Sequence, residues 1–192
     1  MNRGIDNRNI LDKFADDFCS VVDKYVKYIV VSGFVAISHG RSRATEDIDM
    51  IIEKVSFGKF NELHKDLVKH GFECLQSSKE KDIYDYLSRG DSVRYVREGT
   101  FLPPEMEIKF PKDEIDNLQL ATRRKLELTG LDIWFSSIEM NIAFKEELLK
   151  TDKDIEDAKH LRIIYKDDID ESSINEIKEK IKRLRLKKND KG

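Results

Sequence analysis

Two aspartates stand one residue apart in an apolar stretch, residues 47–52, which reads DIDMII. Side chains two apart on a strand point to the same face, so a strand here would present Asp47 and Asp49 together. Neighbouring carboxylates repel each other unless a cation sits between them. Hard oxygen ligands on a rigid strand suit Mg²⁺, which completes its shell with water and phosphate oxygens. The pair therefore predicts a magnesium site, although Asp-x-Asp is also common where a strand start only meets solvent.

A glycine turn precedes these acids. The apolar run Tyr28–Val31 predicts a buried strand, Ser32 and Gly33 a tight turn, and Phe34–Ser38 a short helix. Glycine lets a phosphate approach the backbone closely, and the free N–H groups at a helix start attract anions. Ser32 would cap the helix or donate its hydroxyl. The turn is therefore a candidate phosphate site across from the aspartates.

A polar, basic loop joins that helix to the second strand. It contains Arg41, Ser42 and Arg43, with Thr45 two residues later. From this position the arginines could neutralise a triphosphate or a departing pyrophosphate through charge-assisted hydrogen bonds. The alternative is that they are ordinary solubilising charge. His39, at the end of the helix, is expected to be structural.

The spacing of these parts resembles a known superfamily. Gly33, thirteen residues and then Asp47-x-Asp49 is similar to the signature of the DNA polymerase beta-type nucleotidyltransferases. The longer pattern over residues 33–49 is closer to the minimal nucleotidyltransferases and to the abortive-infection toxins of the AbiEii group. That family usually has Gly-Gly or Gly-Ser at the turn, where this chain has Ser32-Gly33. The resemblance implies magnesium-dependent transfer of a nucleoside monophosphate from an NTP whose phosphates lie on the Gly33 turn.

The resemblance also implies a third carboxylate on a neighbouring strand. Residues 105–110 alternate apolar and charged side chains, which predicts a half-buried strand. Glu107 matches the family position, with Glu where Asp is more usual. It would complete the metal site of the two aspartates and help to activate the acceptor. Asp91 and Glu105 are fallback candidates, and an exposed glutamate paired with Lys109 or an arginine is the competing interpretation.

Two further matches lie in the last third of the chain. Lys145, after the apolar Ile142–Phe144, resembles the helix lysine of the AbiEii-like group that faces the nucleotide phosphates. Its stem would run along a packed face and its head would reach the cleft, unless it belongs to a charged surface. Asp154 and Asp157 share one helix face and resemble the Lys-Asp-x-x-Asp helix that follows this lysine. They could orient Lys145 or an active-site arginine, although acids in a first turn also favour a helix through its dipole.

The elements that must position these residues alternate up to Phe135 and are helical beyond it. Helices are predicted over residues 9–26, 34–38, 56–70, 79–88, 137–150, 152–165 and 172–186, and strands over 28–31, 47–53, 72–75, 92–97, 105–110, 124–129 and 131–135. The last two strands are expected to form a hairpin around Thr129 and Gly130. The expected helix N-caps are Ser56, Ser137, Asp152 and Ser172.

This order predicts an α+β fold. With the resemblance, it gives a nucleotidyltransferase-like mixed β-sheet with helices packed against one side and a C-terminal helical bundle. A boundary near Ser136 would divide the chain into a catalytic domain, 1–136, and a helical region, 137–192.

Composition bounds the class of protein. The chain has 192 residues, 39 % apolar and 38 % charged, with a net charge of −3, so no global field draws it to nucleic acid or to an anionic membrane. Cys19 and Cys74 are far apart, which argues against zinc and against a disulfide framework and favours a reducing cytoplasm. No apolar run reaches membrane-spanning length, so a soluble, cytoplasmic protein without a membrane partner is expected.

Two hypotheses about function follow. The first is a Mg²⁺-dependent nucleotidyltransferase that moves an NMP from an NTP to an acceptor hydroxyl of RNA, protein or a small molecule by two-metal in-line displacement. The second keeps the fold without catalysis, as a binding module that could pair with an antitoxin or toxin partner. The motifs specify neither the base nor the acceptor.

Overall fold

The structure is a computed structural model that describes residues 10–42, 47–100 and 103–189. The strands are β1 (Tyr28–Val31), β2 (Asp47–Ile52), β3 (Phe72–Cys74), β4 (Val93–Arg97), β5 (Glu105–Lys109), β6 (Arg124–Lys125) and β7 (Trp134–Phe135). The α-helices are α1 (Ile10–Val22), α2 (Gly33–Ser38), α3 (Phe57–Lys69), α4 (Glu80–Arg89), α5 (Glu114–Ala121), α6 (Ile138–Phe144), α7 (Asp152–Ile164) and α8 (Glu171–Asn189). A 3₁₀ turn η2 (Glu127–Thr129) and a π-helical segment η3 (Lys145–Leu149) complete them.

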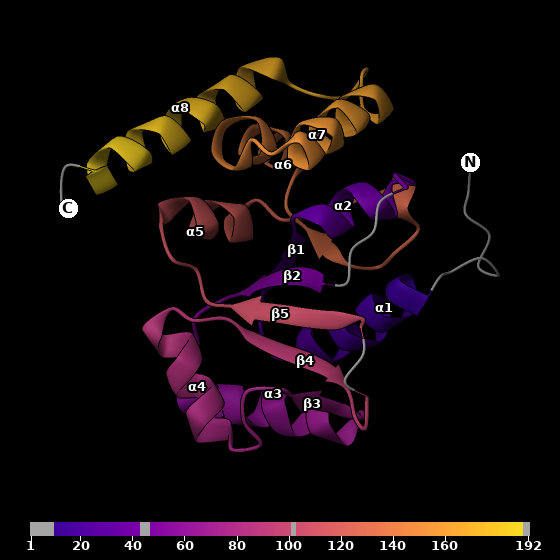
Figure 1. The fold of residues 1–192 in the computed structure, drawn as a ribbon, viewed down its shortest axis with the longest axis vertical. Helices are drawn as coiled ribbons and strands as arrows, with labels where there is room; N and C mark the ends of the chain where they lie inside the picture. The colour runs from indigo at the N-terminus through magenta and orange to yellow at the C-terminus, as the bar shows by residue number, and fades with distance from the viewer. Residues whose placement is uncertain (1–9, 43–46, 101–102, 190–192) are drawn as a thin grey trace.

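The described strands form one mixed sheet in the order β3-β4-β5-β2-β1-β7-β6. β1 and β2 run antiparallel, whereas β2 and β5 run parallel. In Figure 1, α3 and α4 lie at the bottom near β3, α1 lies at about the height of β4 and β5, and α6, α7 and α8 gather at the top. The expected α+β fold, a mixed sheet with helices packed against it, is confirmed.

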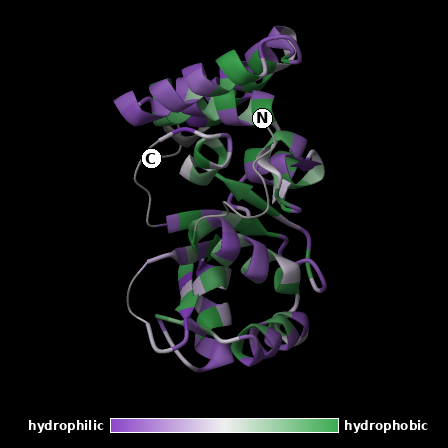
Figure 2. Ribbon diagram, turned by 90° about the vertical axis from the view of Figure 1, so that its right-hand side faces the viewer, coloured by the Kyte–Doolittle hydropathy of each residue, from purple (hydrophilic) through white to green (hydrophobic). Residues whose placement is uncertain are grey.

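The two faces of β2 have different environments because alternate side chains point to opposite sides. Ile48, Met50 and Ile52 are buried in the main core with residues of α1 and α3. Asp47 and Asp49 point to the other face, which has only a small apolar cluster around Ile29, Ile51 and Leu120. Figure 2 shows the hydrophobic residues concentrated on the strands and inner helix faces, and a mainly hydrophilic helix at the top.

Helix α5 is the main difference from the sequence-based prediction, which left residues 111–123 without an element. Asp113 caps it by accepting hydrogen bonds from the amides of Ile115 and Asp116. Its Leu120 packs against Ile51, on the face of the sheet that carries the aspartates. The expectation that the helices lie on one side of the sheet is therefore wrong for α5.

The segment before α6 also differs from expectation. Residues 124–129 were expected to be one strand of a hairpin, but only β6 is extended and η2 follows it. Thr129 turns its hydroxyl back to the carbonyl of Leu126, which stabilises the 3₁₀ turn. β6 and β7 do pair antiparallel, so a hairpin is present with shorter strands.

Two of the four expected N-caps are confirmed. Ser56 and Ser137 accept hydrogen bonds from the amides three residues on. Thr151, rather than Asp152, caps α7 by accepting from the amide of Asp154, and α8 begins at Glu171, one residue before Ser172. In the described part of the chain, no helix has both the length and the apolar character needed to cross a bilayer.

Candidate active site

Four carboxylates occupy one face of β2 and β5. The parallel register pairs Asp47 with Glu105 and Asp49 with Glu107. Because the four side chains alternate with buried apolar residues, all of them point to the same side of the sheet. The two aspartates and the expected third acid are therefore brought together, and Glu105 joins them.

Arg94, on β4, is the cation that holds the two glutamates. Its guanidinium lies 3.1 Å from the Glu107 carboxylate and 3.5 Å from that of Glu105. Glu107 thus has the arginine partner that the competing interpretation of this residue expected. The fallback candidate Asp91 lies before β4 and pairs with Arg89 at the surface.

Burial raises the pKa of Asp49 above its usual value, and the nearby Glu107 and Asp47 carboxylates raise it further. A hydrogen bond from the Ser32 hydroxyl and the charge of Lys109 act in the opposite direction. The pKa of Glu105 is also raised, by burial first and then by Asp47. Because the raised pKa values show that the ionised carboxylates are disfavoured on this face, a bound cation would stabilise their ionised form.

These carboxylates fit a hard divalent cation in donor type and in placement. One buried oxygen, Oε2 of Glu105, accepts no hydrogen bond from the described residues and lies 3.5 Å from Arg94 Nε. Among the residues that the structure describes, however, no three His, Cys, Asp or Glu side chains already converge as a metal site. Asp47 and Asp49 lie opposite Glu105 and Glu107 in the register, and Arg94 contacts Oε2 of Glu107.

The turn before α2 is strained at Ser32. Val31 pairs with Asp49 across β1 and β2, so the turn begins beside the aspartates. Ser32 has φ 67° and ψ −138°, close to a backbone region that essentially only glycine adopts. Of the two roles expected for Ser32, capping the helix is not observed, since its side chain makes no cap hydrogen bond, and its hydroxyl faces Asp49 instead. Gly33 follows as the buried first residue of α2.

Replacing Ser32 isolates this strain. Ser32→Gly and Ser32→Ala both lose the hydroxyl, but only glycine adopts the positive φ without a steric penalty. We therefore expect Ser32→Gly to have the higher free energy of unfolding, by about 1 kcal/mol or more. Chemical denaturation of the two variants measures the difference. An alanine variant as stable as the glycine variant would show that Ser32 carries no strain.

Asp157 is the centre of a buried ion-pair cluster. Its carboxylate accepts from Lys145 Nζ at 2.9 Å and forms an ion pair with Arg41. Asp154 lies 3.4 Å from the same Nζ, and Glu156 pairs with Arg41 from the solvent side. The Lys145 and Asp157 side chains are 1 % and 0 % exposed, so the interpretation of Lys145 as a surface lysine is wrong.

The loop after α2 is described only in part. Arg41 is held against α7 with a side chain 14 % exposed, and is therefore not a freely solvated charge. Ser42 is exposed. Arg43 and Thr45, which the sequence places in the same loop, lie outside the described residues. His39 is structural as expected, since its ring contacts the carbonyl of Val35 and the hydroxyl of Tyr165.

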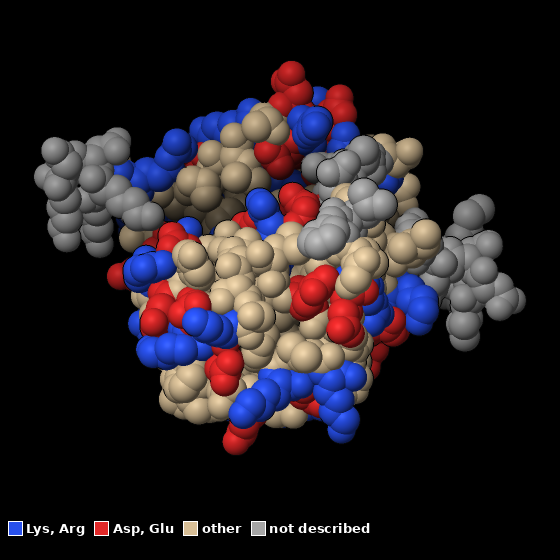
Figure 3. Space-filling view, turned by 60° about the horizontal axis from the view of Figure 1, so that its bottom comes forward, with Lys and Arg blue, Asp and Glu red and all other residues tan. Residues whose placement is uncertain are grey.

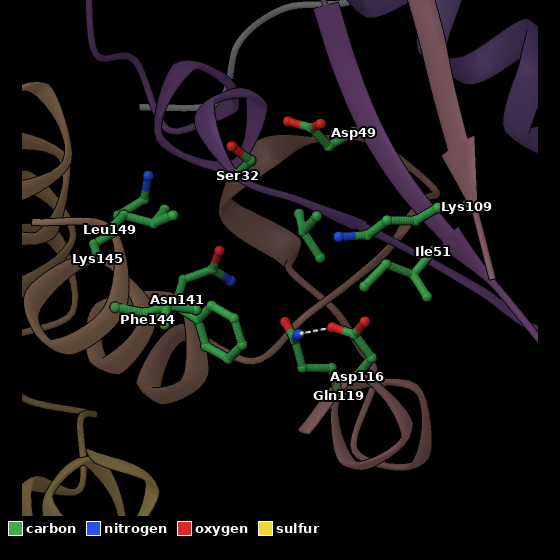
Figure 4. A pocket seen from close by; sticks show the side chains of 12 residues that line it. Ser32, Asp49, Ile51, Lys109, Asp116, Gln119, Asn141, Phe144, Lys145 and Leu149 are labelled. Atoms are coloured by element: carbon green, nitrogen blue, oxygen red, sulfur yellow. Dashed lines mark hydrogen bonds between the residues drawn. The ribbon is translucent and has the colours of Figure 1, made fainter. Parts of the chain in front are cut away.

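A cavity of about 240 Å³ lies between the turn at Ser32, Asp49 of β2 and Lys145. It is lined by the turn and β2, by α5, and by one face of α6 and η3. In Figure 4 the ammonium group of Lys145 points toward Ser32, and Lys109 extends into the cavity from the opposite wall. Figure 3 shows charged side chains around a hollow beneath the upper helices. Asp49, Ser32 and Lys145 thus share one cavity, although Lys145 lies far along the sequence from the other two.

Sequence reasoning missed several residues that line this cavity. Lys109 lies two residues after Glu107 on the same face, which the alternation of β5 could have revealed. Asp116 and Gln119 belong to α5, which was not predicted. Asn141 lies one turn before Lys145, at the i, i+4 spacing that places two side chains on one helix face.

The arrangement of strands and helices is that of nucleotidyltransferase-like proteins. One solved structure with this arrangement is an antigenic nucleotidyltransferase-like protein from Paracoccidioides brasiliensis, with a TM-score of 0.54 and 19 % identity over 94 % of this chain and 89 % of that one. Another is the antibiotic-resistance factor ANT(2'')-Ia, with a TM-score of 0.54 and 10 % identity over 93 % of this chain and 94 % of that one.

At these identities the likeness shows the fold alone. Neither a protein-family model nor a curated protein sequence matches the chain. The narrower resemblance to the AbiEii group stays a prediction.

Proposed function

We propose that the protein is a Mg²⁺-dependent nucleotidyltransferase, which moves an NMP from an NTP to an acceptor hydroxyl and releases pyrophosphate. The observation that carries the proposal is a buried lysine whose head shares one cavity with Asp49 and Ser32. Burying an ammonium group is costly unless the group is paired, and Asp157 and Asp154 pair it here. The Lys145 ammonium group on one side of the cavity and the aspartates of β2 on the other would suit a phosphate that binds together with Mg²⁺.

Several residues around the cavity would bind the triphosphate. An ammonium group has three N–H donors, and the two aspartates accept from Lys145, which leaves a donor for a phosphate oxygen. Ser32 borders the same space, and Gly33 follows it as the first residue of α2. Arg41, which is paired with Asp157 and Glu156, would act from the loop side only by sharing its guanidinium with the phosphates. Together they would hold the triphosphate and stabilise the charge on the departing pyrophosphate.

Asp47 and Asp49, joined by Glu107, would hold the metal ions. When bound, the ions would lower the pKa of the acceptor hydroxyl and neutralise the phosphates. Glu107 would accept the acceptor proton as it leaves. The acceptor is a hydroxyl of RNA, of a protein or of a small molecule.

Label transfer tests the proposal. The protein is incubated with Mg²⁺, total RNA or cell lysate, and each NTP labelled in turn at the α- or the γ-phosphate. We expect α-label, and no γ-label, to become attached to an acceptor, because pyrophosphate carries the γ-phosphate away. The Asp47→Ala/Asp49→Ala double variant should give no product.

One observation favours a second candidate, a binding module that retains the fold without catalysis. Arg94 occupies Glu107, so the third acid is engaged by a protein cation. NTP binding without α-label transfer under any condition would support this candidate, which could be one component of a toxin–antitoxin pair. Transfer of γ-label would contradict both candidates.

The two glutamates offer a matched comparison. If Glu107 takes up the acceptor proton, Glu107→Gln should lower the rate of transfer by roughly 10²–10⁴-fold. Glu105→Gln, two residues earlier on the same face of β5, should change it by less than about tenfold. Single-turnover rates at saturating NTP measure both. The reverse order of effects would assign the third carboxylate to Glu105.

A further inference from the structure

Asn141 presents a fixed hydrogen-bond acceptor to the cavity. Its Nδ2 group donates to the backbone carbonyls of Ser136, at 3.0 Å, and Ser137, at 2.9 Å. Both amide hydrogens are thereby used. Turning the amide over would place Oδ1 against two carbonyl oxygens, so the assignment of O and N is settled by chemistry. Oδ1 is the remaining functional group, and it can only accept.

The position of this oxygen is tightly held. Asn141 is 4 % exposed and lies on the wall of the cavity, and Oδ1 accepts no hydrogen bond from the part of the chain that the structure describes. The adjoining Ser136 is itself fixed, because its hydroxyl donates to Gln119 at 2.9 Å. Gln119 in turn contacts Asp116 through the hydrogen bond drawn in Figure 4. A fixed acceptor discriminates between ligands because it does not rotate to suit them.

The rest of the cavity suits a flat ring system. Phe144, Ile51 and Leu148 supply apolar walls, and the aromatic ring of Phe144 lies beside Asn141 in Figure 4. Pockets for drug-sized molecules span roughly 300–1,000 Å³. At about 240 Å³ this cavity is smaller than that range, and its apolar end has room for a base. Lys145 follows Asn141 by one helical turn, so phosphates at the lysine and a base at the asparagine would belong to one ligand.

We propose that this cavity takes the base of the NTP, and that Asn141 selects bases with an exocyclic amino group over bases that carry none. The inference rests on the proposed function and specifies its substrate. An amino group of adenine, cytosine or guanine would donate to Oδ1. Uracil and hypoxanthine have no such group; the ring N–H of uracil lies between two carbonyl oxygens and that of hypoxanthine beside one, and a carbonyl oxygen next to the donor repels Oδ1. A buried acceptor left without a donor is the physical basis of the selection.

Matched nucleotide pairs test the proposal on the unmodified protein. ATP and ITP differ at the 6-position, amino against keto, and CTP and UTP differ in the same way at the 4-position. Titration calorimetry with Mg²⁺ should show ATP binding roughly ten- to a hundredfold more tightly than ITP, and CTP more tightly than UTP. Equal affinities within both pairs would overturn the proposal.

An asparagine variant assigns the effect to this residue. Asn141→Ala should reduce the difference within each pair to about threefold or less. Asn117→Ala, which removes an exposed asparagine of α5, should leave the difference unchanged. If Asn141→Ala retains the full discrimination, the proposal is wrong. If Asn141→Ala does not fold, the nucleotide pairs on the unmodified protein decide alone.

Different results would contradict base selection by Asn141 and nucleotidyl transfer. If α-label is transferred equally well from ATP and ITP and from CTP and UTP, the role of Asn141 is wrong and the nucleotidyltransferase stands. If the pairs differ in affinity but no label is transferred, base selection stands and catalysis does not.

Discussion

Asp49→Asn is expected to abolish nucleotidyl transfer and, at neutral pH, to make the protein more stable. The carboxylate faces the cavity and is a proposed metal ligand, so the neutral amide should lower the rate of transfer by at least roughly 10²–10³-fold. The gain in stability follows from the raised pKa of Asp49, whose first cause is burial. Asparagine has nearly the same shape and no charge to desolvate.

The sign of the pH dependence is fixed by that shift. A carboxyl group whose folded-state pKa is raised contributes stability below its unfolded pKa, about 3.9 for Asp, and loses it as the pH rises through the folded value. Above the unfolded pKa, the cost of ionising Asp49 in the folded state therefore lowers the free energy of unfolding. The variant should be the more stable protein at pH 7, and the advantage should shrink as the pH falls toward 3.5.

Magnesium provides a readout that does not depend on turnover. A ligand that binds only the folded state raises the melting temperature, so Mg²⁺ should raise Tm for the unmodified protein and much less for Asp49→Asn. Asp91→Asn, a surface carboxylate paired with Arg89, is the matched control and should behave as the unmodified protein. An Asp49→Asn variant that transfers label normally would contradict the proposed site.

Asp157→Ala should be the most destabilising single substitution among the charged residues of the site. It would leave Lys145 buried with only the more distant Asp154, and would remove the buried partner of Arg41. Breaking a buried ion pair by removing one partner costs about 3–5 kcal/mol. For a chain of this size, that corresponds to a fall in Tm of roughly 6–20 °C.

Two comparisons identify the cause of this loss. Glu156→Gln removes the other partner of Arg41, but its side chain is 66 % exposed and the loss should stay under about 1 kcal/mol. The double variant Lys145→Met/Asp157→Leu buries no unpaired lysine and should recover much of the stability, but not the activity. A single Asp157→Ala variant that melts near the unmodified protein would show that the cluster is not dry.

Much of the fold could be predicted from periodicity. The buried run of β1 and the alternation of β5 gave their positions, and the two aspartates share a face as the period of a strand requires. Helix α5 was missed because its sequence, EIDNLQLA, has a weak apolar stripe. It is held by its cap and by packing against a sheet face that only the tertiary structure defines.

The site was harder to predict than the fold, because its contacts join distant residues. Asp157 lies 116 residues from Arg41, and nothing in the local sequence pairs them. The pairing of Arg94 with Glu107 depends on strand register, which the sequence did not give. The motif spacing predicted that Gly33 would adopt the backbone conformation that requires glycine, whereas the residue of this turn with positive φ is Ser32. The resemblance contained this information, since glycine is usual at that position.

The ion-pair cluster around Asp157 has a consequence for how the chain can be divided. α7 follows the last strand, yet it restrains the segment that leads from the phosphate turn toward β2. A fragment ending at Ser136 would retain the carboxylates but expose Arg41 to solvent and remove the α6 and η3 wall of the cavity. The sheet and the C-terminal helices therefore constitute one unit, and the smallest piece that keeps both the cavity wall and the buried partner of Arg41 extends at least through α7.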